Sequence, residues 1–545
     1  MENKVKTFLF LSLLCFQSFI CRADWDFPAG NLSAAGQDSF GPQVAMDPSG
    51  NVVAVWMRFD GSNYIVQARR YDVVASTWSG ATDLTAAGRD AINPQVAMDD
   101  LGNAVAVWYR SDGSNLIVQA RRYDVVAGTW SAVTDLSAVG QHAYDPQVAM
   151  DDLGNAVAVW YRSNGSHDIV QTRRYNVVAG TWSTVEDLSA AGQSAYEPQV
   201  AMDSSGNAFA VWIRSDGSNF IVQARRYDIV AGTWSAVIDL SAVGQHASRP
   251  QVAMDSSGNA VAVWYRSNGS HNIAQSRRYD VVAGTWSAVI DLSASGQSVA
   301  IPQVAMDQVG NAFAVWSRQS GINFIVQTRK YNVLDDTWSV VTDLSAAGQN
   351  AGGSQVAMDK AGNAVAVWII SDGSNTIVQA RRYSVETGTW QTVEELSVVG
   401  QSAFSPQVAM DQSGNAVTVW HRSDGSNDIV QTSRYDGEVY YVWQTVEDLS
   451  AAGQNTYDPQ VASDEFGNAV AVWRRFDGSN YRVQTSRYNA ETDTWSAVET
   501  ISVAGRNAYD PQVSIDSSGE AVVVWRRYDG SKYITQTVRS KLFYQ

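Results

Sequence analysis

Short blocks of alternating or continuous apolar residues run through the whole chain, and turn residues separate them. The blocks are rich in Val, Ile, Tyr and Trp, and no window shows sustained helical spacing. Alternation with period two, and apolar runs of four to eight residues, are typical of β-strands. In the stretch 94–141 the pattern predicts four strands, over residues 95–98, 104–110, 117–123 and 130–136. The second is apolar almost throughout, which indicates burial on both faces.

This four-strand pattern repeats ten times. A Gln-Val pair opens the first predicted strand of every unit, at Gln43, Gln95, Gln147, Gln199, Gln251, Gln303, Gln355, Gln407, Gln460 and Gln512. The step is 52 residues, with a single step of 53 whose extra residue falls in 437–442. Four short strands per unit of this length are the blade pattern of a β-propeller. Each unit also places one Trp on its second strand and one on its fourth, which predicts two large anchors per blade.

The two ends of the chain are out of phase with the repeat. Residues 25–32 read as a fourth strand with no first three before it, and residues 511–540 supply three strands with no fourth. We therefore predict an all-β propeller of ten four-stranded blades, closed by the N-terminal strand. Two five-bladed propellers, divided near 279–286, remain the alternative because ten blades exceed the usual four to eight.

Two known repeat types resemble these units. The run PQVAMDSSGNAVAVW looks like the first hairpin of an NHL repeat. The GTWS segment before the fourth strand is similar to the Asp-box of sialidase-like propellers. It departs from that motif because the stretch from Asp124 to Trp130 is one residue too long and the Ser-x-Asp start is missing. The resemblance implies a propeller fold, and it says little about whether the protein has an enzymatic activity.

The N-terminus has the pattern of an export signal. Lys4 and Lys6 precede an apolar stretch over 8–20, and small residues stand one and three positions before Asp24. We predict a signal peptide over 1–23 and a propeller over 24–545, in a protein that is secreted or held in the periplasm or cell envelope. A lipoprotein signal is a weaker alternative, because bulky Ile20 precedes Cys21. No other segment is apolar enough to span a bilayer.

Charge and cysteine content narrow the partners. The net charge is −17, so no basic field attracts nucleic acid or anionic membranes. Both cysteines fall inside the predicted signal, which leaves the mature chain without disulfides. We expect a monomer.

The most variable predicted loops join each fourth strand to the next unit, and one of their positions is aromatic in six of ten units. These residues are the main candidates for ligand binding, and they are Phe40, Tyr144, Tyr196, Phe404, Tyr457 and Tyr509. In propellers these loops and those between the second and third strands emerge on one face. Aromatic and polar groups gathered there suit sugars or protein partners.

Other polar residues recur at fixed places in the unit. Arg110 and Asp112 flank a hairpin turn, as a structural ion pair or as part of a repeated pocket. Gln119 lies amid apolar residues and needs a buried hydrogen-bond partner on a neighbouring strand or blade. The histidines His142 and His167 lie near the variable face, where they are further candidates for ligand binding. Their spacing follows from duplication, and it predicts no metal site.

No single nucleophile, base or carboxylate pair stands apart from the repeat, so we expect no catalytic residues, no cofactor and no enzyme. The sequence favours a secreted, multivalent binding scaffold for a carbohydrate or a surface protein. A propeller glycosidase or lyase, and a structural protein of the envelope, are the alternatives.

Overall fold

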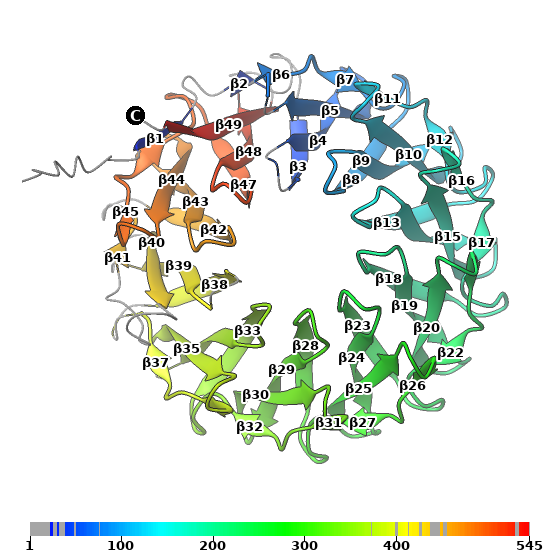
Figure 1. Ribbon diagram of the computed structural model, residues 1–545, viewed down its shortest axis with the longest axis vertical. Helices are drawn as coiled ribbons and strands as arrows, with labels where there is room; N and C mark the ends of the chain where they lie inside the picture. The colour runs from blue at the N-terminus through cyan, green and yellow to red at the C-terminus, as the bar shows by residue number, and fades with distance from the viewer. Residues whose placement is uncertain are drawn as a thin grey trace, which may run out of the picture.

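The computed structural model is an all-β ring of ten blades (Figure 1). It describes residues 22–543 except 26–29, 32–38, 48, 50, 73, 76, 372, 398–399, 401, 412–413, 424–427, 436–446, 451–454 and 529–532. The prediction of one ten-bladed propeller is confirmed, and the alternative of two five-bladed rings is wrong. Residues 1–21 of the predicted signal peptide lie outside the described residues. No helix long and apolar enough to cross a membrane occurs in the described part of the chain.

Each blade is an antiparallel sheet whose first strand borders the centre of the ring (Figure 1). The innermost strands are β3 (Ser39–Met46), β8 (Ala91–Met98), β13 (Ala143–Met150), β18 (Ala195–Met202), β23 (Ala247–Met254), β28 (Val299–Met306), β33 (Asn350–Met358), β38 (Ala403–Met410), β42 (Thr456–Ser463) and β47 (Ala508–Ile515). The second strands are β4 (Val52–Phe59), β9 (Ala104–Ser111), β14 (Ala156–Ser163), β19 (Ala208–Ser215), β24 (Ala260–Ser267), β29 (Ala312–Ser320), β34 (Ala364–Ser371), β39 (Ala416–Ser423), β43 (Ala469–Phe476) and β48 (Ala521–Tyr528). The third strands are β5 (Tyr64–Asp72), β10 (Leu116–Asp124), β15 (Asp168–Asn176), β20 (Phe220–Asp228), β25 (Asn272–Asp280), β30 (Asn323–Asn332), β35 (Thr376–Ser384), β40 (Asp428–Tyr435), β44 (Tyr481–Asn489) and β49 (Tyr533–Phe543).

The outer strand is broken where the sequence predicted a continuous one over 130–136. In the second blade, β11 (Thr129–Trp130) and β12 (Thr134–Asp135) pair separately with β10. Two serine hydroxyls explain the break, because Ser131 Oγ and Ser137 Oγ accept hydrogen bonds from backbone N–H groups of β10. The other outer pieces are β6 (Thr77–Trp78), β7 (Thr82–Asp83), β16 (Thr181–Trp182), β17 (Glu186–Asp187), β21 (Thr233–Trp234), β22 (Ile238–Asp239), β26 (Thr285–Trp286), β27 (Ile290–Asp291), β31 (Thr337–Trp338), β32 (Thr342–Asp343), β36 (Thr389–Trp390), β37 (Glu394–Glu395), β41 (Glu447–Asp448), β45 (Thr494–Trp495) and β46 (Glu499–Thr500).

The N-terminal segment completes the tenth blade, as predicted. Strands β1 (Arg22–Trp25) and β2 (Gly30–Asn31) both pair with β49. Trp25 lies opposite Ser540, the place that a fourth-strand Trp takes in the other blades. The observed pairing starts earlier than residue 25, at Arg22, while residues 26–29 and 32 of the predicted strand lie outside the described residues. The first and last strands of the chain therefore share one sheet, and this sheet closes the ring.

The core lies between adjacent blades and is built on the second strands. Each of these ten strands carries a tryptophan with no exposed surface, and they are Trp56, Trp108, Trp160, Trp212, Trp264, Trp316, Trp368, Trp420, Trp473 and Trp525. Trp108 packs against Val53 and Val55 of the preceding blade. Burial of this kind, repeated at each interface, is the main force that holds the blades together.

A hydrogen-bond relay from the buried Trp108 to the exposed Asp135 links three strands within a blade. Trp108 Nε1 donates to Gln119 Oε1 at 3.2 Å, and Gln119 Nε2 donates to Asp135 Oδ1 at 2.6 Å. The three residues lie directly opposite one another in the sheet register. The expected buried partner of Gln119 is therefore confirmed, and it lies on neighbouring strands of the same blade. The relay satisfies polar atoms that would be costly to bury alone.

Arginine–tyrosine contacts connect neighbouring blades. The buried guanidinium of Arg122 lies over the ring of Tyr175 in the next blade, at 5.1 Å from its centroid, and pairs with Asp124. At the closing interface, Arg539 lies over Tyr71 at 4.1 Å. The seam between the tenth and first blades thus repeats the interaction that joins the other blades, which a ring requires.

Candidate functional site

The variable aromatic residues lie on the innermost strands. The sequence placed Phe40, Tyr144, Tyr196, Phe404, Tyr457 and Tyr509 in loops, and this location is wrong. Each stands near the start of an inner strand, and Tyr144 and Tyr509 pair there with the second strand of their own blade. A register shift follows, between Tyr144 and Gln147 in the third blade. The shift splits the inner strand into two parts, and the predicted strand covered only the second part.

The residue after the aromatic position adopts a left-handed backbone conformation. Eight non-glycine residues at this place have φ between 43° and 57°, and they are Asn93, Asp145, Glu197, Arg249, Ile301, Ser405, Asp458 and Asp510. Each precedes a proline, a position that normally favours extended backbone. Bulges with strained residues are common beside functional sites. Sequence reasoning missed this position, although its variation from Asp to Arg to Ile in front of an almost constant Pro-Gln is a visible signal.

A continuous series of aromatic rings crosses the seam of the ring. This seam arc consists of Tyr457, Tyr481, Tyr509, Tyr533, Phe40 and Tyr64. Successive ring centroids lie 5.9, 5.3, 5.8, 5.6 and 5.6 Å apart, within the range of direct aromatic contact. The six rings are all partly exposed and come from the ninth, tenth and first blades. The seam arc therefore joins residues from both ends of the chain.

Two arginines are embedded in the seam arc. Arg474 and Arg526 follow the buried Trp of β43 and β48. Arg474 Nε lies 2.7 Å from Asp458 Oδ2, and Arg526 Nε lies 2.6 Å from Asp510 Oδ2. The two aspartates occupy the left-handed bulge position, directly beside their arginine partners. Sequence reasoning missed these arginines, although Arg-Arg after Trp473 and Trp525 departs from the Tyr-Arg found after Trp108 and Trp160.

A second arc lies in the second to fourth blades and consists of Tyr109, Tyr144, Tyr161, Tyr196 and Phe220. Neighbouring ring centroids are 6.1, 5.4, 5.4 and 5.8 Å apart. In the fifth to seventh blades the aromatic position holds Ser248, Ala300 and Gly352 instead. The ring is therefore symmetric in its backbone and asymmetric in its inner aromatic surface. Phe404 stands at the same position on β38 and is 36% exposed, and the contacts that define the two arcs do not include it.

The remaining candidates have structural partners. His142 stacks on Tyr144, and its Nδ1 accepts a hydrogen bond from the backbone N–H of Leu116 in the preceding blade. His167 lies in a hairpin turn, where its backbone N–H donates to Asn164. These contacts favour a structural role for both histidines.

The ion pair considered for Arg110 and Asp112 is not what the geometry shows. Arg110 Nη2 donates to the carbonyl of Ala86. Asp112 accepts backbone N–H groups of Ser114 and Asn115 in its own turn, and that of Gly140. These N–H groups hold the pKa of the Asp112 carboxyl below its usual range. Asp112 is therefore a turn cap in this structure.

Four phenols of the two arcs, those of Tyr144, Tyr161, Tyr196 and Tyr509, have a raised pKa and remain protonated at neutral pH. Burial raises the pKa of Tyr509, and burial together with the carboxylates of Asp145 and Asp168 raises the pKa of Tyr161. Burial likewise raises the pKa of Tyr144 and Tyr196. Neutral phenols offer both a hydrogen-bond donor and an acceptor to a ligand.

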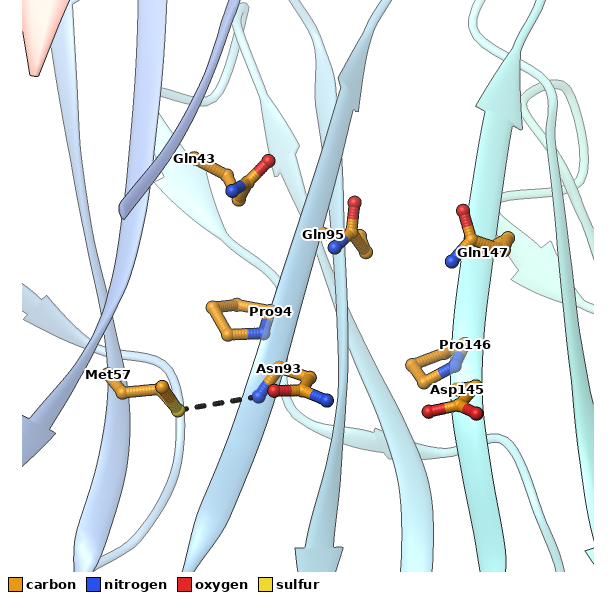
Figure 2. A pocket seen from close by; sticks show the side chains of 8 residues that line it. All are labelled: Gln43, Met57, Asn93, Pro94, Gln95, Asp145, Pro146 and Gln147. Atoms are coloured by element: carbon orange, nitrogen blue, oxygen red, sulfur yellow. Dashed lines mark hydrogen bonds between the residues drawn. The ribbon is translucent and has the colours of Figure 1, made fainter. Parts of the chain in front are cut away.

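A hollow of about 200 Å³ on the inner wall lies between the two arcs (Figure 2). Its lining residues are Gln43, Met57, Asn93, Pro94, Gln95, Asp145, Pro146 and Gln147. Met57 pairs with Phe40 of the seam arc, and Asn93 Nδ2 donates to the hydroxyl of Tyr109 in the second arc. Glutamine amides from three adjacent blades stand side by side there (Figure 2). Among the described residues, no group of three or more His, Cys, Asp or Glu side chains is placed to hold a metal ion.

Comparison with known proteins finds likeness in structure only. No family model matches the chain, and no curated protein sequence matches it. The NHL and Asp-box repeat types therefore remain resemblances. A protein of unknown function from Dyadobacter fermentans is 12% identical, with 55% of this chain and 95% of that chain covered and a TM-score of 0.31. An ulvan lyase bound to a GlcA–Rha3S saccharide is 9% identical, with 61% and 92% covered and a TM-score of 0.36. An α-L-arabinofuranosidase from Fusarium graminearum is 13% identical, with 54% and 92% covered and a TM-score of 0.29.

One expectation from the sequence is corrected by these comparisons. The sequence led us to expect a protein that is not an enzyme, because every candidate group seemed to be repeated. The solved structures that the chain matches include a polysaccharide lyase and a glycosidase, so that exclusion does not stand. The argument behind it also fails, because the seam arc contains a group of Arg, Tyr and Asp side chains that the other described blades do not repeat.

Proposed function

We propose that this propeller binds glycan chains along the aromatic arcs of its inner surface. The observation that carries the proposal is the seam arc, in which six partly exposed aromatic rings follow one another across three blades. Sugar rings present apolar C–H faces that stack on aromatic rings, while their hydroxyl groups bond to neutral phenols and amides. Tyrosine supplies such contact area at a low cost in side-chain entropy.

The arrangement of the sites supports multivalent binding. The second arc and the hollow of Gln43, Gln95 and Gln147 continue the polar and aromatic surface into the second to fourth blades. A long polysaccharide that occupies one arc holds its next segment at high local concentration near the other. Avidity of this kind gives firm attachment from contacts that are individually weak.

The proposal is tested by binding of residues 24–545 to an array of neutral and acidic oligosaccharides, followed by titration calorimetry. We expect Tyr509→Ala to weaken binding about tenfold, the effect of a contact worth about 1.4 kcal/mol. Tyr265→Ala is the matched control, because Tyr265 is partly exposed on β24, outside both arcs as defined. It should change affinity less than twofold.

The same samples separate the alternatives. The ligand would be a protein if no glycan bound and if the propeller instead captured a cell-surface protein in a way that Tyr509→Ala abolished. Shortening of a bound oligosaccharide during incubation, seen by mass spectrometry, would show a glycosidase or lyase. Equal effects of Tyr509→Ala and Tyr265→Ala would contradict the seam arc as the binding surface.

We further propose that the protein acts after export, as a secreted, periplasmic or envelope protein. Lys4, Lys6, the apolar stretch over 8–20 and the small residues before Asp24 support this. Mass spectrometry of the exported protein should find an N-terminus at Asp24. An N-terminus at Met1 on protein recovered from the cytoplasm would contradict export. Cleavage before Asp24 would leave Trp25 paired with Ser540 and so preserve the closing strand.

A further inference from the structure

The seam arc differs from the rest of the inner surface in charge. In eight blades the residue after the second-strand tryptophan is neither arginine nor lysine, and these residues are Met57, Tyr109, Tyr161, Ile213, Tyr265, Ser317, Ile369 and His421. In the ninth and tenth blades it is Arg474 and Arg526. The only two arginines at this sequence position therefore stand on adjacent blades, within one aromatic arc.

Aromatic rings hold both guanidinium groups in place. The central carbon of Arg474 lies 5.0, 5.1 and 5.3 Å from the ring centroids of Tyr457, Tyr481 and Tyr509. That of Arg526 lies 5.3, 5.2 and 5.5 Å from those of Tyr509, Tyr533 and Phe40. Tyr509 thus lies between the two arginines and contacts both. A cation enclosed by aromatic rings is oriented before any ligand arrives.

The aspartate partners leave part of each guanidinium available. Asp458 and Asp510 each approach the Nε atom of their arginine. Within the described part of the chain, the Nη1 and Nη2 atoms of Arg474 and of Arg526 have no hydrogen-bond acceptor. The two side chains are 23% and 26% exposed, so solvent reaches them. The unused Nη groups form a donor pair of the geometry that binds a carboxylate or a sulfate.

The second arc has carboxylates at the same bulge positions but no arginine after its second-strand tryptophans to pair with them. Acidic side chains stand beside it, because Asp145 and Glu197 occupy its bulge positions and Asp168 begins β15. Asp145 and Asp168 contribute to the raised pKa of Tyr161, which shows that their charge is felt at the arc. An anionic group on a bound sugar is therefore disfavoured at the second arc and favoured only at the seam arc.

We propose that the seam arc selects acidic sugars, with the carboxylate of a uronic acid or the sulfate of a sulfated sugar bound by the Nη groups of Arg474 and Arg526. This inference rests on the proposed glycan binding and assigns its substrate class. The net charge of −17 repels polyanions over long distances, so recognition at the seam depends on these local contacts.

The test replaces both arginines by the residue that the second, third and fifth blades carry. The double variant Arg474→Tyr, Arg526→Tyr keeps an aromatic inner surface and removes both cations. Titrations use three probes, namely oligogalacturonate, chondroitin sulfate oligosaccharide and neutral arabino-oligosaccharide. We expect at least tenfold weaker binding of an acidic probe, with less than a twofold change for the neutral one. The carboxylate and sulfate probes show which of the two anions fits.

A second double variant distinguishes the loss of the two positive charges from a loss of structure, because it is expected to strengthen binding. Asp458→Asn with Asp510→Asn removes two negative charges and keeps an oxygen beside each Nε, so acidic probes should bind more tightly. Unchanged acidic binding in both double variants would overturn the inference, and so would equal losses for acidic and neutral probes. If the arginine and aspartate variants gave either of these results while Tyr509→Ala still weakened glycan binding about tenfold, the glycan-binding proposal would stand without the preference for acidic sugars. Absence of any glycan binding by the unaltered protein would instead defeat the underlying proposal.

Discussion

Replacement of Trp108 by alanine is expected to lower the free energy of unfolding by about 3–5 kcal/mol, the usual cost of removing a fully buried aromatic side chain. Trp108 has no exposed surface and packs against Val53 and Val55 of the preceding blade. The substitution also removes the Nε1–H donor that Gln119 accepts at 3.2 Å. A buried acceptor without its partner adds to the cost of the cavity.

Trp130 of the same blade is the matched control. It lies on the outer strand, is only half-buried, and contacts the ring of Tyr123 at 5.6 Å. Its replacement by alanine should cost about 1–2 kcal/mol, because less apolar surface returns to water. Denaturant unfolding of the two variants, followed by tryptophan fluorescence and circular dichroism, measures both losses. Equal losses would show that the second strand contributes no more than the outer strand to the cohesion of the ring.

The two tryptophans of a blade differ in burial in a way that the sequence did not predict. The repeat placed one Trp on the second strand and one on the fourth, and it predicted two large anchors per blade without ranking them. The structure separates them, because Trp108 lies between two blades while Trp130 lies at the outer circumference. The local pattern around the two residues is similar, and only the distance from the centre of the ring distinguishes their burial. Gln119 was easier to predict, since a polar residue amid apolar strands needs a partner wherever the strand lies.

The candidate site was predictable in part. Variation at Tyr144, Tyr457 and Tyr509 singled out the position whose rings take part in the two arcs, although their strand was mistaken for a loop. Pro at the shifted register hid the first half of that strand, because prolines usually mark strand ends or edges. The repeat pattern could not predict the contact of Phe40 with Tyr533, because this contact depends on how the two ends of the chain meet. The pairing of Asp458 with Arg474 depends on the left-handed bulge, which the sequence did not reveal.

Deletion of residues 24–36 is expected to lower the melting temperature more than a trim of residues 541–545 at the other terminus. The reason is that the deletion removes the strand that closes the ring. The deletion takes away the pairing of Trp25 with Ser540 and of Gly30 and Asn31 with β49. It leaves the outer edge of β49 without its partner and removes the covalent connection between the tenth blade and β3. We expect the melting temperature to fall by roughly 3–5 °C, because the unfolding entropy of a chain of this size makes each kcal/mol of lost stability worth about 1 °C.

A trim of residues 541–545 is the matched control at the other terminus. It removes the strand partners of Arg22, Ala23 and Asp24. If the chain is cleaved before Asp24, as predicted, Arg22 and Ala23 are already absent, and the trim removes only the partner of Asp24. The trim should therefore lower the melting temperature by less than half as much, as measured by differential scanning calorimetry. The deletion should also weaken glycan binding at the seam arc, because Phe40 and Tyr533 come from the two blades that it loosens. Equal effects of the two truncations would show that face packing around Val52, Ala54 and Val524, with Arg539 over Tyr71, holds the seam without its fourth strand.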